Sequence, residues 1–480
     1  MITLKKTISL LLLTLFFAAD SFAFCGFYVA KADSKIFNKA SQVIIARDGN
    51  KTVITMSNDF QGKVKNFAMV VPVPQVLQEQ NIRVVDRNIF DKLDAYSSPR
   101  LVEYHDPAPC NVYDRRYKSM PQSVVASEVK REMTDESNME DKDLGVTIQA
   151  KYNVGEYDIL ILSATQSNGL KTWLTQNGYK IPRNAEEVLD PYIKSDMKFF
   201  VAKVNLSKFE NQGFTNLRPL QITMNSPKFM LPIRLGMANG RGNQDLIIYT
   251  LTKKGRVECT NYRTIKMPTG MDMPTFIKDD FGNFYADVFK KRWQRNRGKA
   301  VYLEYSWDIS PRNFVKCDPC VSPAPNFSDM QRAGAWWVEG SRNENVHFTR
   351  LHVRYNRKKF PQDLKFQTTP NKTNFQARYV LRHPYRGDVS CDKGQQYVNK
   401  VINRREAELE NLEFYTGQDA YNHNDYVREW ERKLEKKRYR KGSTNPFGEN
   451  TIGVLLFILL NISIVISVLN YKKARARNCK

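Results

Sequence analysis

The feature that most constrains this chain is an uncharged apolar run of 18 residues near its C-terminus, from Ile452 to Leu469. As an α-helix it would be about 27 Å long at 1.5 Å per residue, close to the roughly 30 Å hydrocarbon core of a bilayer. Basic residues flank the run on both sides, so charge alone does not set its orientation. We expect a transmembrane helix over residues 451–470 and a cytoplasmic tail over residues 471–480. A buried core helix and a processed sorting tail are the alternatives.

A second apolar run, Ile8 to Ala19, follows two lysines near the N-terminus and precedes the small residues of Ser21-Phe22-Ala23. This order is typical of a secretory signal peptide, and the run is short for a membrane span. We predict a signal peptide over residues 1–23 and an extracytoplasmic body, held at the inner or plasma membrane by a single pass. A buried N-terminal helix is one alternative. A lipid anchor on Cys25 is another, although Phe24 rather than a small residue precedes that cysteine.

Charge is unevenly distributed along the chain. There are 74 Lys and Arg against 50 Asp and Glu among 480 residues, a formal net charge of +24. The predicted signal peptide carries a net charge of +1 and the last thirty residues carry +5, which leaves +18 for the exported body. Such a body is attracted to polyanions, so we expect the membrane and either anionic lipid or envelope polysaccharide as partners. Nucleic acid is not an expected partner of an exported chain.

Six of the seven cysteines fall in the exported part, and an even number there predicts disulfide bonds formed in an oxidising compartment. The disulfide candidates, whose pairing stays open, are Cys25, Cys110, Cys259, Cys317, Cys320 and Cys391. Cys317 and Cys320 form a C-x-x-C pair in a proline-rich segment. Because a redox-active pair needs a low-pKa thiolate, usually at a helix N-terminus, we favour a structural bridge over redox chemistry or a metal site. A zinc site would need further ligands, and Cys391 and His383 qualify only by residue type. We therefore predict no metal and no cofactor.

Apolar and β-branched patterns predict strands through most of the exported body. Asp48-Gly49-Asn50 lies between two β-rich runs in residues 42–56, which is a hairpin signal. Pro72 and Pro74 make residues 67–73 an edge strand or one that ends there. A short helix fits residues 88–96, and helical spacing recurs around Trp173. Further strands are expected at residues 197–206, 301–307, 347–355 and 375–381.

These periods predict an α+β fold class: a strand-dominated extracytoplasmic body, a helical neck and a single C-terminal transmembrane helix. The segments of the body and neck are an N-terminal β-rich domain (24–115), a flexible linker or insertion (116–144), a central α+β domain (145–300), a C-terminal β-rich domain with the Cys pair (301–400) and a helical basic neck (401–450). The linker is polar, charged and nearly free of aromatic residues. A solvated helix is the alternative for that segment.

The strongest candidate for a binding site is a basic cluster. If residues 348–355 are extended, Arg350, His352 and Arg354 share one face. A second strand at 375–381 carries Arg378, and Arg382 would join it if the strand continues. Should the two strands pair, these five residues would form an anion-binding cluster able to hold carboxylate or phosphate. The alternative is a half-buried sheet whose basic face is solvated or balanced by acidic partners.

The neck is predicted to hold two helices, residues 398–414 and a second helix with an apolar stripe that includes Tyr426 and Trp430. Basic residues from Arg432 to Lys441 could bind anionic headgroups at about 1 kcal/mol each near the surface. A protein partner could also dock on this helix. The alternative is a solvent-exposed helix without a binding role, in which nearby glutamates partly compensate the charge.

Several separated motifs occur in a defined order: FAMVVPVP, then YDILILSA with a TWL…NGY helix, CDPC, TRLHVRY and FQARYVLRHPY. With them, the chain resembles the bacterial domain of unknown function 2330 family from about Cys25 to beyond Cys391. The resemblance implies an exported bacterial protein, often with a C-terminal anchor, and no established activity or catalytic residue.

Motifs of common enzyme classes are missing from the sequence, which has no G-x-S-x-G, H-E-x-x-H or P-loop pattern. Nothing points to a Ser-His-Asp set among its five histidines. We therefore predict no catalytic residues and a non-enzymatic binding or structural module of the envelope with an anionic partner. An envelope enzyme with thiol-redox chemistry at Cys317 and Cys320, or a subunit of an envelope complex, are the alternatives.

Overall fold

The computed structural model describes residues 40–57, 68–110, 144–177, 185–211, 217–239, 242–311, 322–340 and 344–442. These residues divide into two compact units, which are described separately. The larger unit holds the described residues up to 105, those from 144 to 383, and residues 410–418. The smaller unit holds residues 106–110, 384–409 and 419–442.

The predicted fold class needs a correction. The described residues form a mixed α/β, strand-rich structure with several sheets, and they include no helix that is both long and apolar enough to cross a bilayer. The structure therefore gives no support to the single C-terminal transmembrane helix of the predicted fold class. The run for which it was predicted (451–470) lies outside the described residues, as do the predicted signal peptide (1–23) and cytoplasmic tail (471–480).

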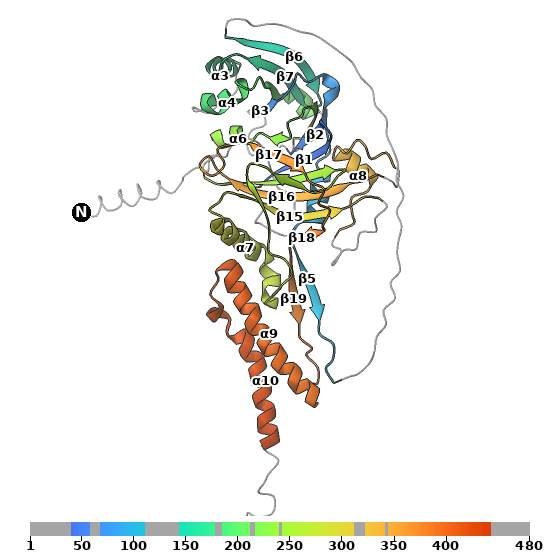
Figure 1. Cartoon of the computed structure of the whole chain (residues 1–480), viewed down its shortest axis with the longest axis vertical. Coiled ribbons are helices and arrows are strands. Elements are labelled where there is room, and N and C mark those ends of the chain that lie inside the picture. Colours follow the sequence, from blue (N-terminus) through green and yellow to red (C-terminus); the bar gives the residue numbers. More distant parts are fainter. Residues whose placement is uncertain are drawn as a thin grey trace, which may run out of the picture. The chain divides into compact units, whose positions relative to one another are not determined.

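The largest sheet of the described residues has nine strands (Figure 1). Their order is β13 (Arg263–Lys266), β15 (Ala300–Asp308), β16 (His347–Tyr355), β11 (Gln244–Thr252), β1 (Ala40–Asp48), β2 (Lys51–Met56), β9 (Leu220–Asn225) and β4 (Ile82–Val84), with β18 (Phe375–Gln376) paired to β15. The central strand β16 is antiparallel to both of its neighbours, β15 and β11. Its residues are buried almost throughout because other elements cover both faces of the sheet.

Local sequence signals explain the edges of this architecture. The predicted hairpin is confirmed: β1 and β2 are antiparallel, and Gly49 takes the positive φ of 57° that the turn requires. The predicted edge strand is also confirmed, since β3 (Ala68–Val73) has one neighbour, β8, in the described part of its sheet. Pro72 is tolerated there because an edge strand need not donate every backbone N–H.

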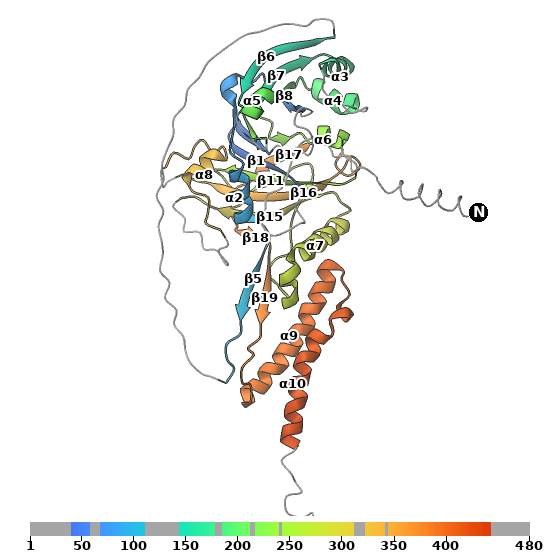
Figure 2. The same cartoon turned by 180° about the vertical axis from the view of Figure 1, so that it is seen from behind.

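The second sheet is antiparallel and is covered by two helices (Figure 2). Its strands are β3, β8 (Lys198–Val204), β7 (Tyr157–Ala164) and β6 (Val146–Val154), and the helices are α3 (Ser167–Gln176) and α4 (Ala185–Ile193). Leu170, Trp173 and Leu174 recur at helical spacing on α3 and pack into one buried cluster with residues of the sheet. This amphipathic helix is the one that the sequence pattern predicted.

Two three-stranded sheets complete the larger unit. One consists of β14 (Met271–Met273), β19 (Arg378–His383) and β5 (Arg100–His105), and the other of β10 (Met230–Leu231), β17 (Leu364–Thr368) and β12 (Val257–Cys259). The remaining helices of this unit are α2 (Asn88–Ser97), α5 (Leu206–Asn211), α6 (Arg234–Asn239), α7 (Phe281–Arg295), α8 (Phe327–Arg332) and the 3₁₀ turns η3 (Glu79–Asn81) and η4 (Thr275–Asp280). Strands from the segments 24–115, 145–300 and 301–400 pair within one sheet, so the described residues of these segments up to 105 and from 145 to 383 belong to one folded unit.

The smaller unit is built on two helices, α9 (Asp392–Thr416), which continues into the larger unit, and α10 (Asp425–Gly442), preceded by the 3₁₀ turn η5 (Ala420–His423). The predicted apolar stripe on the second helix is used for packing, because Trp430 is 2% exposed and meets the ring of Tyr397 edge-on. Arg405 lies over the ring of Tyr426 at 3.7 Å, and the Tyr426 hydroxyl donates to Glu408 at 2.6 Å.

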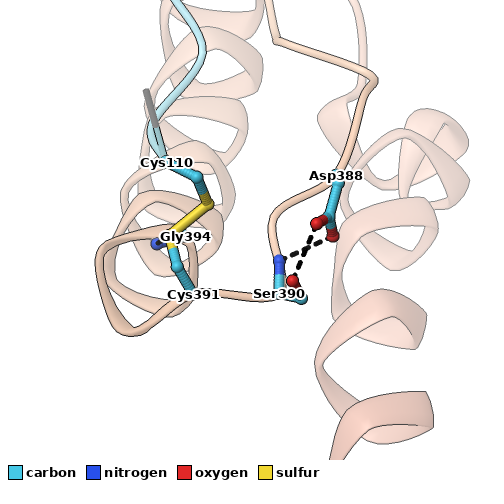
Figure 3. The surroundings of a disulfide bond; sticks show 5 residues. All are labelled: Cys110, Asp388, Ser390, Cys391 and Gly394. Carbon is cyan, nitrogen blue, oxygen red and sulfur yellow. Dashed lines mark hydrogen bonds between the residues drawn. A yellow bond between two sulfur atoms is a disulfide. The ribbon is translucent and has the colours of Figure 1, made fainter. Parts of the chain in front are cut away.

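A disulfide between Cys110 and Cys391 closes the smaller unit (Figure 3). The two Cα atoms are 5.9 Å apart, within the usual range for a disulfide. The bond joins residues 281 positions apart and fixes the start of α9 to the end of the segment that follows β5. Cys259 also belongs to the predicted disulfide set, but it carries a free, buried thiol. Cys25, Cys317 and Cys320 lie outside the described residues.

We expect proteolysis of the unreduced protein to release the Cys110 and Cys391 peptides joined to each other, as identified by mass spectrometry. Cys391→Ser should lower the unfolding free energy of the smaller unit by about 2–5 kcal/mol, since the bond limits the unfolded chain. Calorimetry measures that loss. Cys259→Ala is the control and should leave the joined peptide in place. Alkylation of Cys110 after denaturation without reductant would contradict the assignment.

Candidate ligand-binding pocket

The predicted basic residues of β16 share one face, but acidic side chains already occupy that face. Arg350, which is 0% exposed, donates from Nε to Glu304 Oε2 and from Nη1 to Asp94 Oδ1, both at 2.6 Å. Glu304 comes from the neighbouring strand β15, and Asp94 from α2. The guanidinium therefore joins two strands of the sheet to the helix that packs against it.

The next two basic residues of β16 are neutralised in the same way. His352 lies between two carboxylates, with Nδ1 at 2.8 Å from Glu304 and Nε2 at 3.1 Å from Asp245. Arg354 makes a two-point contact with Asp245 at 2.8 and 2.9 Å. We call these six residues the β16 network: Asp94, Asp245, Glu304, Arg350, His352 and Arg354. With His352 protonated, it holds three positive and three negative charges.

The pKa directions follow from this pairing. Burial raises the pKa of Glu304, but His352 and Arg350 outweigh burial and hold that pKa at about 2. Burial lowers the pKa of His352, but the carboxylates of Glu304 and Asp245 outweigh it and raise that pKa above the ordinary value. The Tyr285 hydroxyl completes the shell of Glu304 by donating to it at 2.5 Å. The β16 network is therefore a closed, charge-balanced core.

The structure does not bring the five predicted anion-binding residues together. β15 lies between β16 and β18, and β19 belongs to a different sheet, where it pairs with β14 and β5. Arg378 and Arg382 are carried by β19, and Arg382 donates to Asp272 at 2.9 Å. The assumption that the two strands pair is thus corrected, and the face of β16 is the one balanced by acidic partners.

A serine and a histidine also meet inside the larger unit. Ser306 Oγ and His347 Nε2 are 2.9 Å apart, and the two residues are 0% and 1% exposed. A catalytic histidine uses its second ring nitrogen to donate to an orienting carboxylate, but His347 Nδ1 is buried with no hydrogen-bond partner among the described residues. Burial, reinforced by Arg256 and Lys372, lowers the pKa of His347 to about 4 despite Asp308. We assign this pair a structural role.

The described residues include one free thiol, that of Cys259, and no candidate metal cluster. Burial raises the pKa of the Cys259 thiol, which keeps it protonated and unreactive. The C-x-x-C residues Cys317 and Cys320 lie in the 312–321 gap, so the redox alternative stays a prediction. Within the described ranges, no cluster of three or more His, Cys, Asp or Glu side chains could hold a metal ion.

An apolar pocket lies in the larger unit, where the largest sheet, the edge strand β3 and residues 228–235 meet. About 880 Å³ of empty space lies between its lining residues, a figure that includes space open to solvent. Side chains at alternate positions of β2 and β9 form much of its lining, because alternate residues of a strand point to the same face. These are Thr52, Ile54 and Met56 on β2, and Ile222, Met224 and then Ser226 along β9.

The other lining residues are mainly apolar as well. β3 and the residues that follow it contribute two prolines, Pro72 and Pro74, and the loop beyond β9 contributes Pro232. Four methionines line the pocket: Met56, Met197, Met224 and Met230. Methionine side chains are flexible and polarisable, so such a lining adapts to apolar ligands of varied shape.

Sequence reasoning missed this pocket because it is assembled from distant segments. Its residues run from Val43 to Tyr355 and belong to different sheets. The signal that was present is the pair of prolines at the end of β3, Pro72 within the strand and Pro74 just beyond it, which predicted an edge strand. β3 has no strand paired on its outer side among the described residues, and the pocket lies between this edge and the largest sheet.

The two buried histidines of β16 predict opposite dependences of stability on pH. The raised pKa of His352 means that its contribution is present below pH 6.5 and is lost as pH rises through the folded-state pKa. The folded-state pKa of about 4 for His347 means that the protein loses stability as pH falls below 6.5. The loss of unfolding free energy caused by His352→Gln should therefore be larger at pH 5 than at pH 9.

His347→Gln is the matched variant, and its cost should shrink by roughly 2 kcal/mol between pH 7.5 and pH 5. Chemical denaturation of both variants and the unmodified chain, repeated at each pH, measures these differences. If the free-energy cost of the two substitutions changed equally with pH, the charge states assigned to His347 and His352 would be contradicted.

Comparisons with known proteins add a family but no activity. No curated protein matches the chain. Solved structures with some similarity include a mutated baculovirus P35 after caspase cleavage (12% identity, TM-score 0.24, covering 45% of this chain and 66% of that one). The caspase-8/P35 complex is another, at 10% identity and a TM-score of 0.25, covering 48% and 68%. Scores at this level carry no argument about fold or function.

The family comparison agrees with the resemblance seen in the sequence motifs. The matching family model is described as an uncharacterized protein conserved in bacteria, domain of unknown function 2330. The match covers residues 19–367, well over half of the chain, and ends before Cys391. The chain therefore belongs to the domain of unknown function 2330 family.

Proposed function

We propose that this protein is a non-enzymatic binding protein of the bacterial envelope that holds an apolar ligand in the pocket beside β3. The observation that carries the proposal is the pocket itself, which is largely apolar and partly open. An apolar pocket with a few polar groups is the usual form of a small-molecule site.

The polar clusters of the same unit support binding rather than catalysis. The β16 network satisfies its charges internally, and the Ser306–His347 pair is closed to solvent. Neither cluster lines the pocket. A reacting group would need both a perturbed side chain and access to substrate, and in the described residues the two are separated.

An extracytoplasmic location is part of the proposal. The Cys110–Cys391 bond supports it, because disulfides persist in oxidising compartments and are rare in the bacterial cytosol. The excess of basic residues supports an anionic partner. The disulfide and the basic charge both agree with the envelope location expected from the sequence.

The test uses a neutral hydrophobic fluorophore, N-phenyl-1-naphthylamine, titrated into the purified full chain. We expect saturable fluorescence enhancement, because the probe leaves water for the pocket. Met224→Trp places a larger side chain in the lining and should weaken binding at least tenfold.

Met271→Trp is the matched control, since Met271 is also half-buried but belongs to β14 and does not line the pocket. It should bind the probe as the unmodified chain does, which also accounts for probe taken up elsewhere on the protein. Circular dichroism confirms that both variants fold. Equal probe binding by the two variants would overturn the proposed site.

A further inference from the structure

A buried arginine stands at the end of the pocket face of β1. Val43 lines the pocket, and Val43 and Ile45 belong to the core cluster on that face. Since alternate residues of a strand share a face, Arg47 continues the same row. It is 8% exposed and lies over the ring of Phe229 at 4.8 Å.

The guanidinium of Arg47 contacts two residues of the pocket lining. Its Nη1 donates to Thr52 Oγ1 at 2.5 Å, and its Nη2 donates to the carbonyl oxygens of Ser226 at 3.1 Å and Pro227 at 3.3 Å. Thr52 and Ser226 both line the pocket. These contacts use three of the five N–H groups of a guanidinium, and the described residues provide no acceptor for the other two.

Arg47 differs from the other buried arginine of this sheet in having no acidic partner among the described residues. Arg350 meets both Asp94 and Glu304, whereas the acceptors of Arg47 in the described structure are a hydroxyl and two carbonyl oxygens. Burial alone lowers the pKa of Arg47. A buried charge without a counter-ion is costly, and an anionic ligand would remove that cost.

A second cation belongs to the same end of the pocket. Lys228 lines the pocket two residues beyond Ser226, and its residue is exposed to solvent. Among the described residues, the lining contains no Asp or Glu. The pocket therefore combines a largely apolar lining with two cations: the Arg47 guanidinium, held at Thr52 and Ser226, and Lys228, two residues further along the chain.

We infer that the pocket binds an amphipathic molecule with a single long acyl chain and an anionic head group, a carboxylate or a phosphate, with the head at Arg47 and Lys228 and the chain among the apolar residues. This inference rests on the proposed function and adds the ligand class. Guanidinium groups bind carboxylate and phosphate through paired, charge-assisted hydrogen bonds. A methionine-rich lining suits a flexible chain.

The test is competition against N-phenyl-1-naphthylamine on the full chain with four single-chain lipids of sixteen carbons. Palmitate and 1-palmitoyl-lysophosphatidate carry the two anionic head groups, hexadecanol is the neutral analogue, and hexadecyltrimethylammonium is the cationic one. We expect each anion to displace the probe at a concentration at least tenfold below that of hexadecanol, and the cation to be weakest. Whichever anion competes better identifies the source, and either result supports the inference.

Variants separate the head-group contacts from the fold. Lys228→Gln changes an exposed residue and should reduce the preference for palmitate over hexadecanol about threefold. Arg47→Met keeps an apolar stem of similar length and should reduce it further, while the affinity for hexadecanol stays the same. Lys358→Gln changes an exposed lysine outside the pocket and should leave the preference intact.

Three results would overturn all or part of the inference, and they are distinguishable from one another. If the probe binds but palmitate and hexadecanol compete equally, the pocket remains a binding site and the anionic head group is rejected. If the probe does not bind at all, the proposed function falls together with the inference. An unchanged preference in both Lys228→Gln and Arg47→Met would reject these two residues as the head-group contacts.

Discussion

The fold depends on a carboxylate buried in the middle of its largest sheet. Glu304 is 0% exposed and bonds Arg350, His352 and Tyr285, so one side chain links β15, β16 and α7. Arg350 extends the link to Asp94 on α2. Removing one partner from such a set leaves an uncompensated charge, which typically costs about 3–5 kcal/mol. These charges therefore stabilise the fold as one unit, and the loss of any one affects the others.

The same sheet serves two purposes on its two faces. On β16, Arg350 and His352 point to the network, while Leu351 and Val353 point to the apolar cluster on the other face. The pocket lies on that second face, next to Tyr355 at the end of β16. One face of the sheet is thus hydrogen-bonded and internally neutral, and the other is apolar and rich in methionine.

Local structure was largely predictable from the sequence, and long-range assembly was not. Gly49 in its turn, the prolines of β3 and the spacing of Leu170 and Trp173 all act within a few residues, and each predicted its element. The partners of Arg350 lie 46 and 256 positions away, so no local pattern identifies them. The pocket was missed for the same reason, because distant segments form it. The sequence also suggested that the strands at 347–355 and 375–381 could pair, whereas β15 lies between β16 and β18, and β19 belongs to another sheet.

The bond between Cys110 and Cys391 imposes a sequence of events on oxidative maturation. Cys110 is synthesised 281 positions before its partner, and Cys259, Cys317 and Cys320 are all made in the interval. A nascent chain that meets an oxidant can pair Cys110 with one of these sulfurs, or with Cys25, before Cys391 is made. A chain paired in this way reaches the final bond by thiol–disulfide exchange, which takes seconds to hours without a catalyst. The yield of mature protein should consequently depend on a disulfide isomerase in the compartment where the chain folds.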